Sequence, residues 1–442
     1  MKKSPLLLWL LSGLVAGTVQ ASTPALTMRV VPERDVLLTG NAREVVVQIE
    51  IEGRRPEHVE RVPMNLAIVL DRSGSMAGAK LEKARQAACV ALDQLDENDY
   101  VSMVVYDNRP DVLFPPQRIE SAKEREALKE RIQHIQPGGG TAIHAGLKLG
   151  ASELAKHMDR ERVNRIILLS DGIANVGPSR TSDLAELGHD LREQGMGVTT
   201  VGLGDDYNED LMTAVAEASH ANYYYVQDAE KLPGIFSEEL GVARSVLARE
   251  VTIRVTVPEG VHIREILGHP EVKCQEHSAQ ITLPEYFGAD KRRFLARCVV
   301  DSPGHEPLEV ASVGLKYEEN GTGKAGAQNE AVTVKFTDEA KKSEESVRVD
   351  VAKAFNVQMN CAAKDLAVKL ADEGKGKEAA KVLRDQMIAN SAAPAAAQIP
   401  NLAEENRKLE SSAADVDAHG NLSRTGRKQV QYENWQDKNQ KR

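Results

Sequence analysis

The chain has 442 residues, of which 41% are hydrophobic and 28% charged, the composition of a globular protein long enough for several domains. Its formal net charge of -10 argues against nucleic acid as a partner, because nucleic-acid-binding chains carry a basic surface. Aromatic residues make up only 4%, too few for extended surfaces that stack bases or sugars.

The N-terminus has the pattern of a secretory signal peptide. Lys2 and Lys3 precede an apolar run from Leu6 to Val15, and small residues end at Ala21. We therefore expect residues 1–21 to be removed and the mature protein to be periplasmic or secreted. An uncleaved anchor is the alternative, although the apolar run is short for a membrane span. No other segment approaches that length, so we expect no integral membrane segment after cleavage.

Two regions, residues 22–62 and 248–340, alternate apolar and polar residues as strands do. The first region cannot bury a sheet face alone, so its strands need partners. We predict that strands of both regions complete one antiparallel β-sandwich. The intervening residues 63–247 would then be an insertion in that sandwich.

Residues 63–247 alternate strand and helix patterns, which predicts an α/β domain with a Rossmann-like, doubly wound, mostly parallel sheet. Its first strand, the apolar run Leu66–Leu70, has the pattern of a strand buried on both faces. We expect helices on both faces of this sheet. The pair Gly202 and Gly204 lacks the third glycine of a dinucleotide fingerprint, so we expect no nucleotide cofactor.

Oxygen-bearing side chains follow the first buried strand at alternate positions. Asp71, Ser73 and Ser75 lie between that strand and a predicted helix, and hard divalent cations prefer such oxygen ligands. Ser73 or Ser75 alone would serve equally well as a helix N-cap. Two later segments favour the cation: Thr141 follows three glycines, and Asp171 follows another buried apolar run.

This pattern resembles the von Willebrand factor type A (VWA) domain, whose metal-ion-dependent adhesion site reads Asp-x-Ser-x-Ser, then a distant Thr and a distant Asp. The resemblance implies that a divalent cation, Mg²⁺ or else Mn²⁺ or Ca²⁺, is held by Asp71, Ser73, Ser75, Thr141 and Asp171. It also implies a protein partner whose Glu or Asp completes the coordination sphere. The predicted sandwich around the domain resembles secreted VWA proteins related to the inter-alpha-trypsin inhibitor heavy chains.

Residues 341–390 show apolar spacings of three and four residues, which predicts a helical hairpin. Residues 391–442 contain an alanine- and proline-containing linker, a possible short helix over residues 401–411, and a polar end that we predict to be a flexible tail. Tyr432 and Trp435 in this tail are free to dock on a partner or on the body of the protein. Cys274 and Cys298 fall on or beside predicted neighbouring strands and are candidates for a disulfide.

Three functions are open at this stage. The favoured one is a cation-dependent protein-binding module for adhesion or envelope assembly, which is not an enzyme and has no catalytic residue. The second is a Mg²⁺-dependent hydrolase in which His144 acts as the base. The third is a structural scaffold in which the cation only stabilises the loop.

Overall fold

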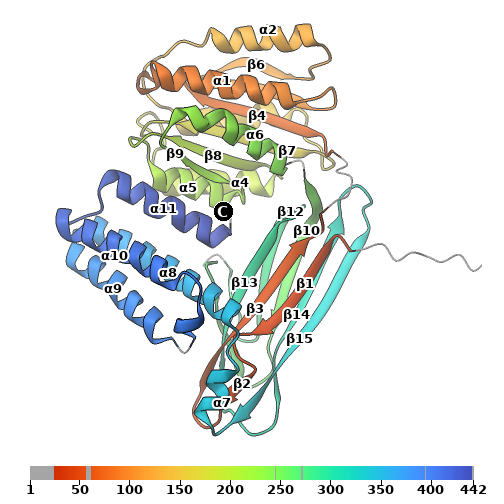
Figure 1. Cartoon of the computed structure of the whole chain (residues 1–442). Helices are drawn as coiled ribbons and strands as arrows, with labels where there is room; N and C mark the ends of the chain where they lie inside the picture. The colour runs from red at the N-terminus through yellow and green to blue at the C-terminus, as the bar shows by residue number, and fades with distance from the viewer. Residues whose placement is uncertain (1–23, 56–60, 244, 270–271, 394, 441–442) are drawn as a thin grey trace, which may run out of the picture.

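The computed structural model describes residues 24–55, 61–243, 245–269, 272–393 and 395–440 (Figure 1). The predicted signal peptide therefore lies outside the described residues. The described chain has three parts: an α/β domain, a β-sandwich and a set of C-terminal helices. Among the described helices, none combines the length and the apolar character needed to cross a membrane.

The α/β domain is built on a six-stranded sheet in the order β6-β5-β4-β7-β8-β9, in which only the edge strand β6 is antiparallel. Its strands are β4 (Met64–Asp71), β5 (Tyr100–Tyr106), β6 (Pro110–Gln117), β7 (Val163–Ser170), β8 (Gly197–Leu203) and β9 (Tyr223–Val226). Its helices are α1 (Ala79–Gln94), α2 (Ala122–Gln133), α3 (Ile143–Ala155), α4 (Thr181–Glu193), α5 (Glu209–Ala218) and α6 (Leu232–Ala243).

Both faces of this sheet are covered. Successive side chains of a strand point to opposite faces, and in β4 every residue is buried. Leu66 and Ile68 belong to the apolar core on one face, whereas Ala67 and Val69 belong to the core on the other. This arrangement confirms the predicted doubly wound, mostly parallel sheet.

The β-sandwich contains one sheet in the order β1-β3-β13-β11 and a second in the order β12-β10-β14-β15-β2. Its strands are β1 (Leu26–Pro32), β2 (Val36–Leu38), β3 (Arg43–Gly53), β10 (Val246–Thr256), β11 (Val261–Leu267), β12 (Ser278–Phe287), β13 (Lys291–Val300), β14 (Leu308–Glu319) and β15 (Ala325–Thr337). Because β3 pairs with β13, strands from before and after the α/β domain share one sheet. The α/β domain is thus inserted in the sandwich, as predicted, although the short β2 pairs with β15 in parallel.

The C-terminal part has five helices, α7 (Ala340–Glu345), α8 (Val349–Asp372), α9 (Gly376–Ala392), α10 (Leu402–His419) and α11 (Arg424–Asn439). The predicted helical hairpin corresponds to α8 and α9. The predicted short helix over residues 401–411 is confirmed as part of the longer α10, whereas the prediction of a flexible polar end is wrong for residues 424–439, which form α11. Alanines and a few larger apolar residues of α8, α9 and α10 share a small core, and such an alanine-rich stripe is a weak signal in sequence.

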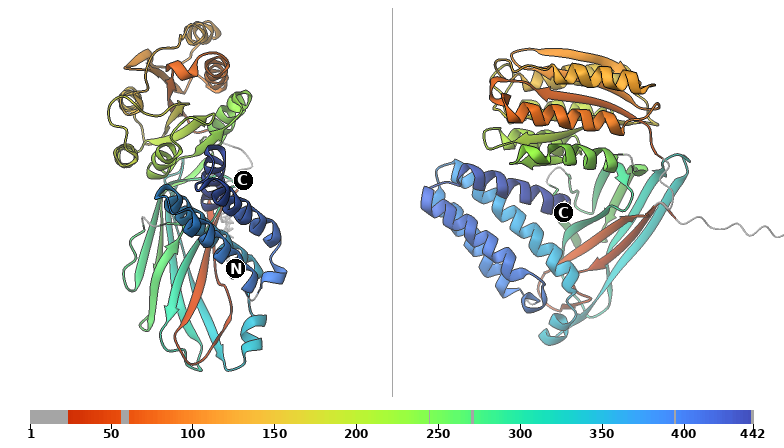
Figure 2. Two further views of the ribbon diagram at one scale, coloured as in Figure 1. Left: turned by 90° about the vertical axis from the view of Figure 1, so that its left-hand side faces the viewer. Right: turned by 45° about the horizontal axis from the view of Figure 1, so that its top comes forward.

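Helix α11 docks on the α/β domain through polar contacts and aromatic rings, and in both views of Figure 2 the C-terminal helices lie beside both other parts. The Trp435 ring meets the Tyr223 ring edge-on, with centroids 6.1 Å apart. Lys428 is 3% exposed, and its ammonium donates to the Tyr207 carbonyl and to Glu209. The sequence of α11 is polar, and its partners are distant in the chain. Its own residues therefore have the pattern of a solvated tail.

The four cysteines are free thiols in the structure, so the predicted Cys274–Cys298 disulfide is not formed. Cys298 points into the sandwich core from β13, and burial raises the pKa of its thiol to about 12. Cys274 lies beside the strands, in the connection between β11 and β12, where its sulfur lies 3.9 Å from the Val272 carbonyl oxygen.

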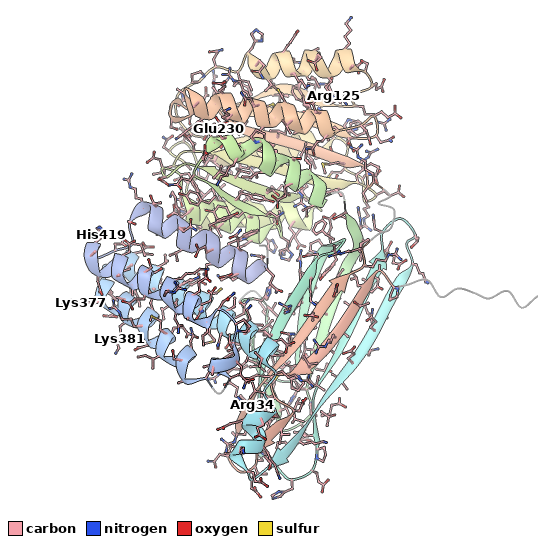
Figure 3. All side chains as sticks on the ribbon, viewed as in Figure 1. Arg34, Arg125, Glu230, Lys377, Lys381 and His419 are labelled. Atoms are coloured by element: carbon pink, nitrogen blue, oxygen red, sulfur yellow. The ribbon has the colours of Figure 1, made fainter. Side chains whose placement is uncertain are left out.

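Charged side chains are spread over all three parts of the molecule, as Figure 3 shows with Glu230 on the α/β domain and Lys377 and Lys381 on the C-terminal helices. Each of these three residues is exposed. The apolar residues are gathered in several cores, and some of these are shared between parts: Val46 and Leu295 of the sandwich, for example, cluster with Val351 of α8.

Candidate metal centre

The site residues predicted from sequence meet at the carboxyl edge of the central strands. Asp71 is the last residue of β4, and Asp171 follows the end of the neighbouring strand β7. Parallel neighbours end at the same edge of a sheet, so two carboxylates distant in sequence become adjacent. Ser73 and Ser75 lie in the connection from β4 to α1, and Thr141 lies just before α3.

Hydrogen bonds link four of these residues, Asp71, Ser73, Ser75 and Asp171, in a continuous chain. The Ser73 and Ser75 hydroxyl oxygens are 3.1 Å apart, and the Ser75 hydroxyl donates to Asp171 Oδ1 at 2.7 Å. The Ser73 backbone amide donates to Asp71 Oδ1 at 2.7 Å. Ser73 precedes a short 3-10 helix, Gly74–Met76, but its hydroxyl makes no cap hydrogen bond, and the N-cap of α1 is Gly78, so neither serine hydroxyl caps a helix.

Thr141 is brought to the same place by the glycine-rich loop before α3. The Gly138 amide donates to the Arg72 carbonyl at 2.6 Å, and the Gly74 amide donates to the Gly139 carbonyl at 2.9 Å. A Cβ atom at Gly138 would lie only 2.0 Å from an Asp107 carboxylate oxygen, so this close approach requires glycine. The two loops are therefore locked together by their backbones.

Gly172 leaves space between two of the hydroxyls. A Cβ atom at this position would lie 3.2 Å from Thr141 Oγ1 and 3.5 Å from Ser75 Oγ. The Thr141 amide in turn donates to the Asn175 side chain at 2.8 Å, and the Asn175 amide donates to the Thr141 carbonyl at 3.2 Å. A glycine next to Asp171 thus keeps the hydroxyls of both loops accessible.

The electrostatics favour a cation here. Asp71 and Asp171 are both 0% exposed, whereas Ser75 is exposed at the rim. The pKa of Asp71 is raised to about 6, chiefly by burial and in smaller part by the negative charge of Asp171, while hydrogen bonds from Ser170 and Ser73 oppose the shift. In the part of the chain that the structure describes, the two buried carboxylates face a single positive charge, the Lys80 ammonium beside Asp171, and all the candidate metal donors are oxygens. The residues present therefore fit a hard divalent cation.

The family comparison agrees with this geometry: residues 65–238 match the von Willebrand factor type A domain family. These residues form a VWA domain. The donors that we predicted from the adhesion-site pattern are the residues that the VWA sheet collects at its carboxyl edge.

Relatives match this chain over part of its length. The uncharacterised protein sll0103 of Synechocystis is 32% identical over 211 residues, which are 48% of this chain and 47% of that relative. Human inter-alpha-trypsin inhibitor heavy chain H3 is 29% identical over 194 residues, which are 41% of this chain and 22% of the relative. The chain thus spans less than half the length of these relatives, and both alignments are consistent with the predicted distant similarity.

A solved structure shares the whole fold. The von Willebrand factor type A protein of Catenulispora acidiphila superposes with a TM-score of 0.71 and 18% identity, covering 93% of this chain and 96% of that one. This likeness shows that the VWA domain, the sandwich and the C-terminal helices recur together.

Two residues that sequence reasoning missed contact the VWA site. Ser170 donates to Asp71 Oδ2 at 2.6 Å, and the Lys80 ammonium lies 2.5 Å from Asp171 Oδ2. Ser170 directly precedes Asp171, so its place at the strand end was a usable signal. Lys80 in the first turn of α1 gave none, since a lysine on a helix is usually a solvated residue.

His144, the base of the hydrolase alternative, is half-buried in the first turn of α3. Burial and, next, the charge of Lys148 lower its pKa. In the described part of the chain, His144 is not among the side-chain hydrogen-bond partners of the five site residues.

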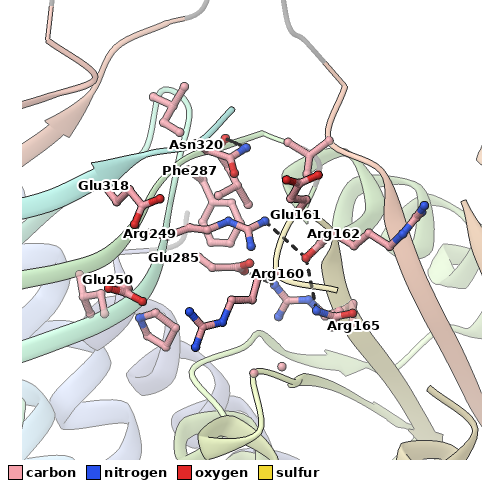
Figure 4. A pocket seen from close by; sticks show the side chains of 18 of the residues that line it. Arg160, Glu161, Arg162, Arg165, Arg249, Glu250, Glu285, Phe287, Glu318 and Asn320 are labelled. Atoms are coloured by element: carbon pink, nitrogen blue, oxygen red, sulfur yellow. Dashed lines mark hydrogen bonds and ion pairs between the residues drawn. The ribbon is translucent and has the colours of Figure 1, made fainter. Parts of the chain in front are cut away.

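A separate cleft of about 1320 Å³ lies between the VWA domain and the sandwich (Figure 4). It adjoins Pro63, which directly precedes β4, about 26 Å from Asp71 at about 3.3 Å per strand residue. Arg165 is 4% exposed, and its guanidinium lies 3.6 Å from Glu285 of the sandwich. Arg249 donates across the cleft to the Arg162 carbonyl at 3.4 Å. Charges of both signs thus join the two parts here.

Proposed function

We propose that this protein is a cation-dependent protein-binding module, and not an enzyme, in which a VWA site holds a divalent cation and a partner protein supplies a carboxylate to it. The observation that carries the proposal is that some of the oxygen donors are buried while another is exposed. Asp71 and Asp171 are fully buried and provide charge, while Ser75 is exposed and opens the site to solvent. Mg²⁺ is the proposed ion, with Mn²⁺ and Ca²⁺ as alternatives.

The chain's own residues prepare the site for such a partner. Asp71 and Asp171 hold the two loops through hydrogen bonds and are themselves held by Ser170 and Lys80. When bound, the cation supplies a positive centre that attracts a Glu or Asp side chain to an otherwise acidic protein. Without that centre, a carboxylate would be repelled by the net charge of -10.

An exposed apolar side chain lies next to the oxygen donors. Ile173 follows Gly172 closely and is 61% exposed, one of a few large hydrophobic side chains exposed in the described chain. A hydrophobic side chain beside a charged anchor is the arrangement that interface hot spots use, since it excludes water from the charged contact. Ile173 therefore supports a protein partner over a small soluble anion.

The decisive experiment compares Thr141→Val and Ser75→Ala with the control Ser182→Ala, an exposed serine on α4. Thr141→Val keeps the shape of the buried side chain and removes only the hydroxyl donor. By contrast, Asp71→Ala would leave the Ser73 amide and the Ser170 hydroxyl without their acceptor, at about 1–3 kcal/mol each. Loss of binding in that variant would be confused with loss of folding.

Immobilised protein is incubated with envelope extract in Mg²⁺ or in chelator, and retained proteins are identified. We expect a partner that is retained with Mg²⁺, released by chelator, lost in Thr141→Val and kept in Ser182→Ala. Retention in chelator, or undiminished retention in Thr141→Val, would contradict the proposal. A cation that raises the melting temperature without affecting retention would favour the scaffold function, and Mg²⁺-dependent hydrolysis lost in His144→Ala would favour the enzyme.

We also propose that the protein acts outside the cytoplasm, in the periplasm or as a secreted protein. The proposal rests on the signal-peptide pattern of residues 1–21. Fractionation followed by N-terminal sequencing tests it: the mature protein is expected to begin at Ser22. A cytoplasmic protein that keeps its first residues would contradict it.

A further inference from the structure

A second group of potential ligands lies on the sandwich, at the connection between β11 and β12. His262 is near the start of β11, and Glu276 and His277 lie in the turn before β12. One ligand atom of each residue lies within 4.8 Å of the others. The two imidazole rings face each other, with centroids 5.6 Å apart and planes inclined by 30°.

The hydrogen bonds of the two histidines leave one nitrogen of each ring able to bind a metal ion. His262 Nε2 lies 2.6 Å from an Asp301 carboxylate oxygen, and His277 Nδ1 lies 3.3 Å from the Val261 carbonyl oxygen. Both oxygens accept, so both of these nitrogens carry the hydrogen. In the neutral rings, the lone pairs therefore lie on His262 Nδ1 and His277 Nε2.

Glu276 does not hydrogen-bond the free nitrogen of His262. The distance from His262 Nδ1 to Glu276 Oε1 is 3.8 Å, too long for a hydrogen bond. Two ligands of a tetrahedral zinc ion lie about 3.3–3.6 Å apart, because each metal–ligand distance is about 2.0–2.2 Å, so 3.8 Å is within a few tenths of an ångström of that range. The separation thus suits a shared cation better than a direct contact.

The backbone holds the group in place. The His277 carbonyl accepts from the Val257 amide at 3.0 Å, and the Glu276 carbonyl accepts from the Ile263 amide at 3.4 Å. The Asp301 amide donates to the Gly260 carbonyl at 3.0 Å, so the residue that orients His262 is held as well. A carboxylate and a carbonyl that fix the ring tautomers are the usual outer partners of metal-binding histidines.

We propose that His262, Glu276 and His277 form a second cation site that binds transition-metal ions such as Zn²⁺. Solvent would occupy the remaining coordination position. Two imidazoles and one carboxylate suit zinc, nickel or copper and not Mg²⁺ or Ca²⁺, which take oxygen ligands. The site is thus chemically distinct from the one in the VWA domain, and it is accessible because Glu276 and His277 are exposed.

The test uses the full chain without an affinity tag, stripped with chelator and kept in excess Mg²⁺. Zn²⁺ is titrated by calorimetry, and Co²⁺ absorption reports the ligand geometry. The variants His277→Gln and Glu276→Gln are compared with His305→Gln, an exposed histidine outside the group. We expect one Zn²⁺ fewer per chain, or at least tenfold weaker binding, in the first two variants and no change in the control.

Asp301→Asn separates a built site from a chance cluster. Loss of an orienting partner weakens metal binding about 10–100-fold without removing a ligand. Zn²⁺ binding that is equal in the unsubstituted protein and in His277→Gln, or Zn²⁺ binding that is absent from the unsubstituted protein, would overturn the proposal. Thermal melts of each variant establish that these exposed substitutions leave the fold intact.

Discussion

Lys80 competes with the cation for Asp171, and its removal is expected to tighten cation binding. The Lys80 ammonium lies 2.5 Å from Asp171 Oδ2, while Asp171 is completely buried. The same ammonium lies 3.5 Å from the Cβ position of Gly204, so it is held between α1 and the loop after β8. A divalent cation that uses Asp171 must overcome this ion pair and the repulsion of its positive charge.

The magnitude follows from the exposure of the pair. A hydrogen bond between charged groups contributes about 1.5–3 kcal/mol to stability. The lower end applies, because the Lys80 side chain is 30% exposed and solvent screens its charge. Lys80→Met is thus expected to release about 1.4 kcal/mol, which lowers the Kd for Mg²⁺ or Mn²⁺ about tenfold.

Calorimetric titration of chelator-stripped protein with Mn²⁺ measures the effect. Lys83→Met is the matched control: Lys83 is on the same helix, its side chain is 20% exposed, and it pairs with Glu230 at 2.8 Å. Both substitutions remove one positive charge from α1, so only the difference between them reports the contact of Lys80 with Asp171. If Lys80→Met bound Mn²⁺ no better than Lys83→Met, or bound it more weakly, Lys80 would support the cation-bound site and the reasoning would be refuted.

Three further predictions concern the partner surface, the C-terminal helices and the thiols. Ile173→Ser is expected to weaken partner binding at least tenfold and to leave the Mn²⁺ affinity unchanged, since the side chain is exposed beside the donors. Surface plasmon resonance measures the partner binding and calorimetry the Mn²⁺ affinity. A parallel loss of both would contradict a contact between Ile173 and the partner. Lys428→Met leaves the buried Glu209 with one fewer partner, so the free energy of unfolding measured by urea denaturation is expected to fall by about 3 kcal/mol. The control Lys381→Met, at an exposed position, is expected to lower it by less than about 0.5 kcal/mol. Burial raises the thiol pKa of Cys298 and Cys361 to about 12, so both are protonated at pH 8; iodoacetamide should label them only after denaturation, and rapid native labelling would be contrary evidence.

Local patterns predicted the elements and the chemistry of the main site. The apolar run Leu66–Leu70, ending in Asp71, identifies a buried strand and the place where it stops, because burial on both faces needs consecutive apolar residues. The types and order of the oxygen donors then indicated a cation site in one α/β domain. The alternation of the flanking regions likewise predicted the sandwich and the insertion within it.

Only the tertiary structure decided which polar residues become partners. Lys80 and Lys428 both read as solvated helix positions, yet one pairs with buried Asp171 and the other anchors α11 beside Glu209. The tail was mispredicted for the same reason, since its helices are held by contacts with segments far away in the chain. Apolar periodicity is set by near neighbours and is visible in sequence, whereas a charge has no period, and its partner is known only when the chain has folded.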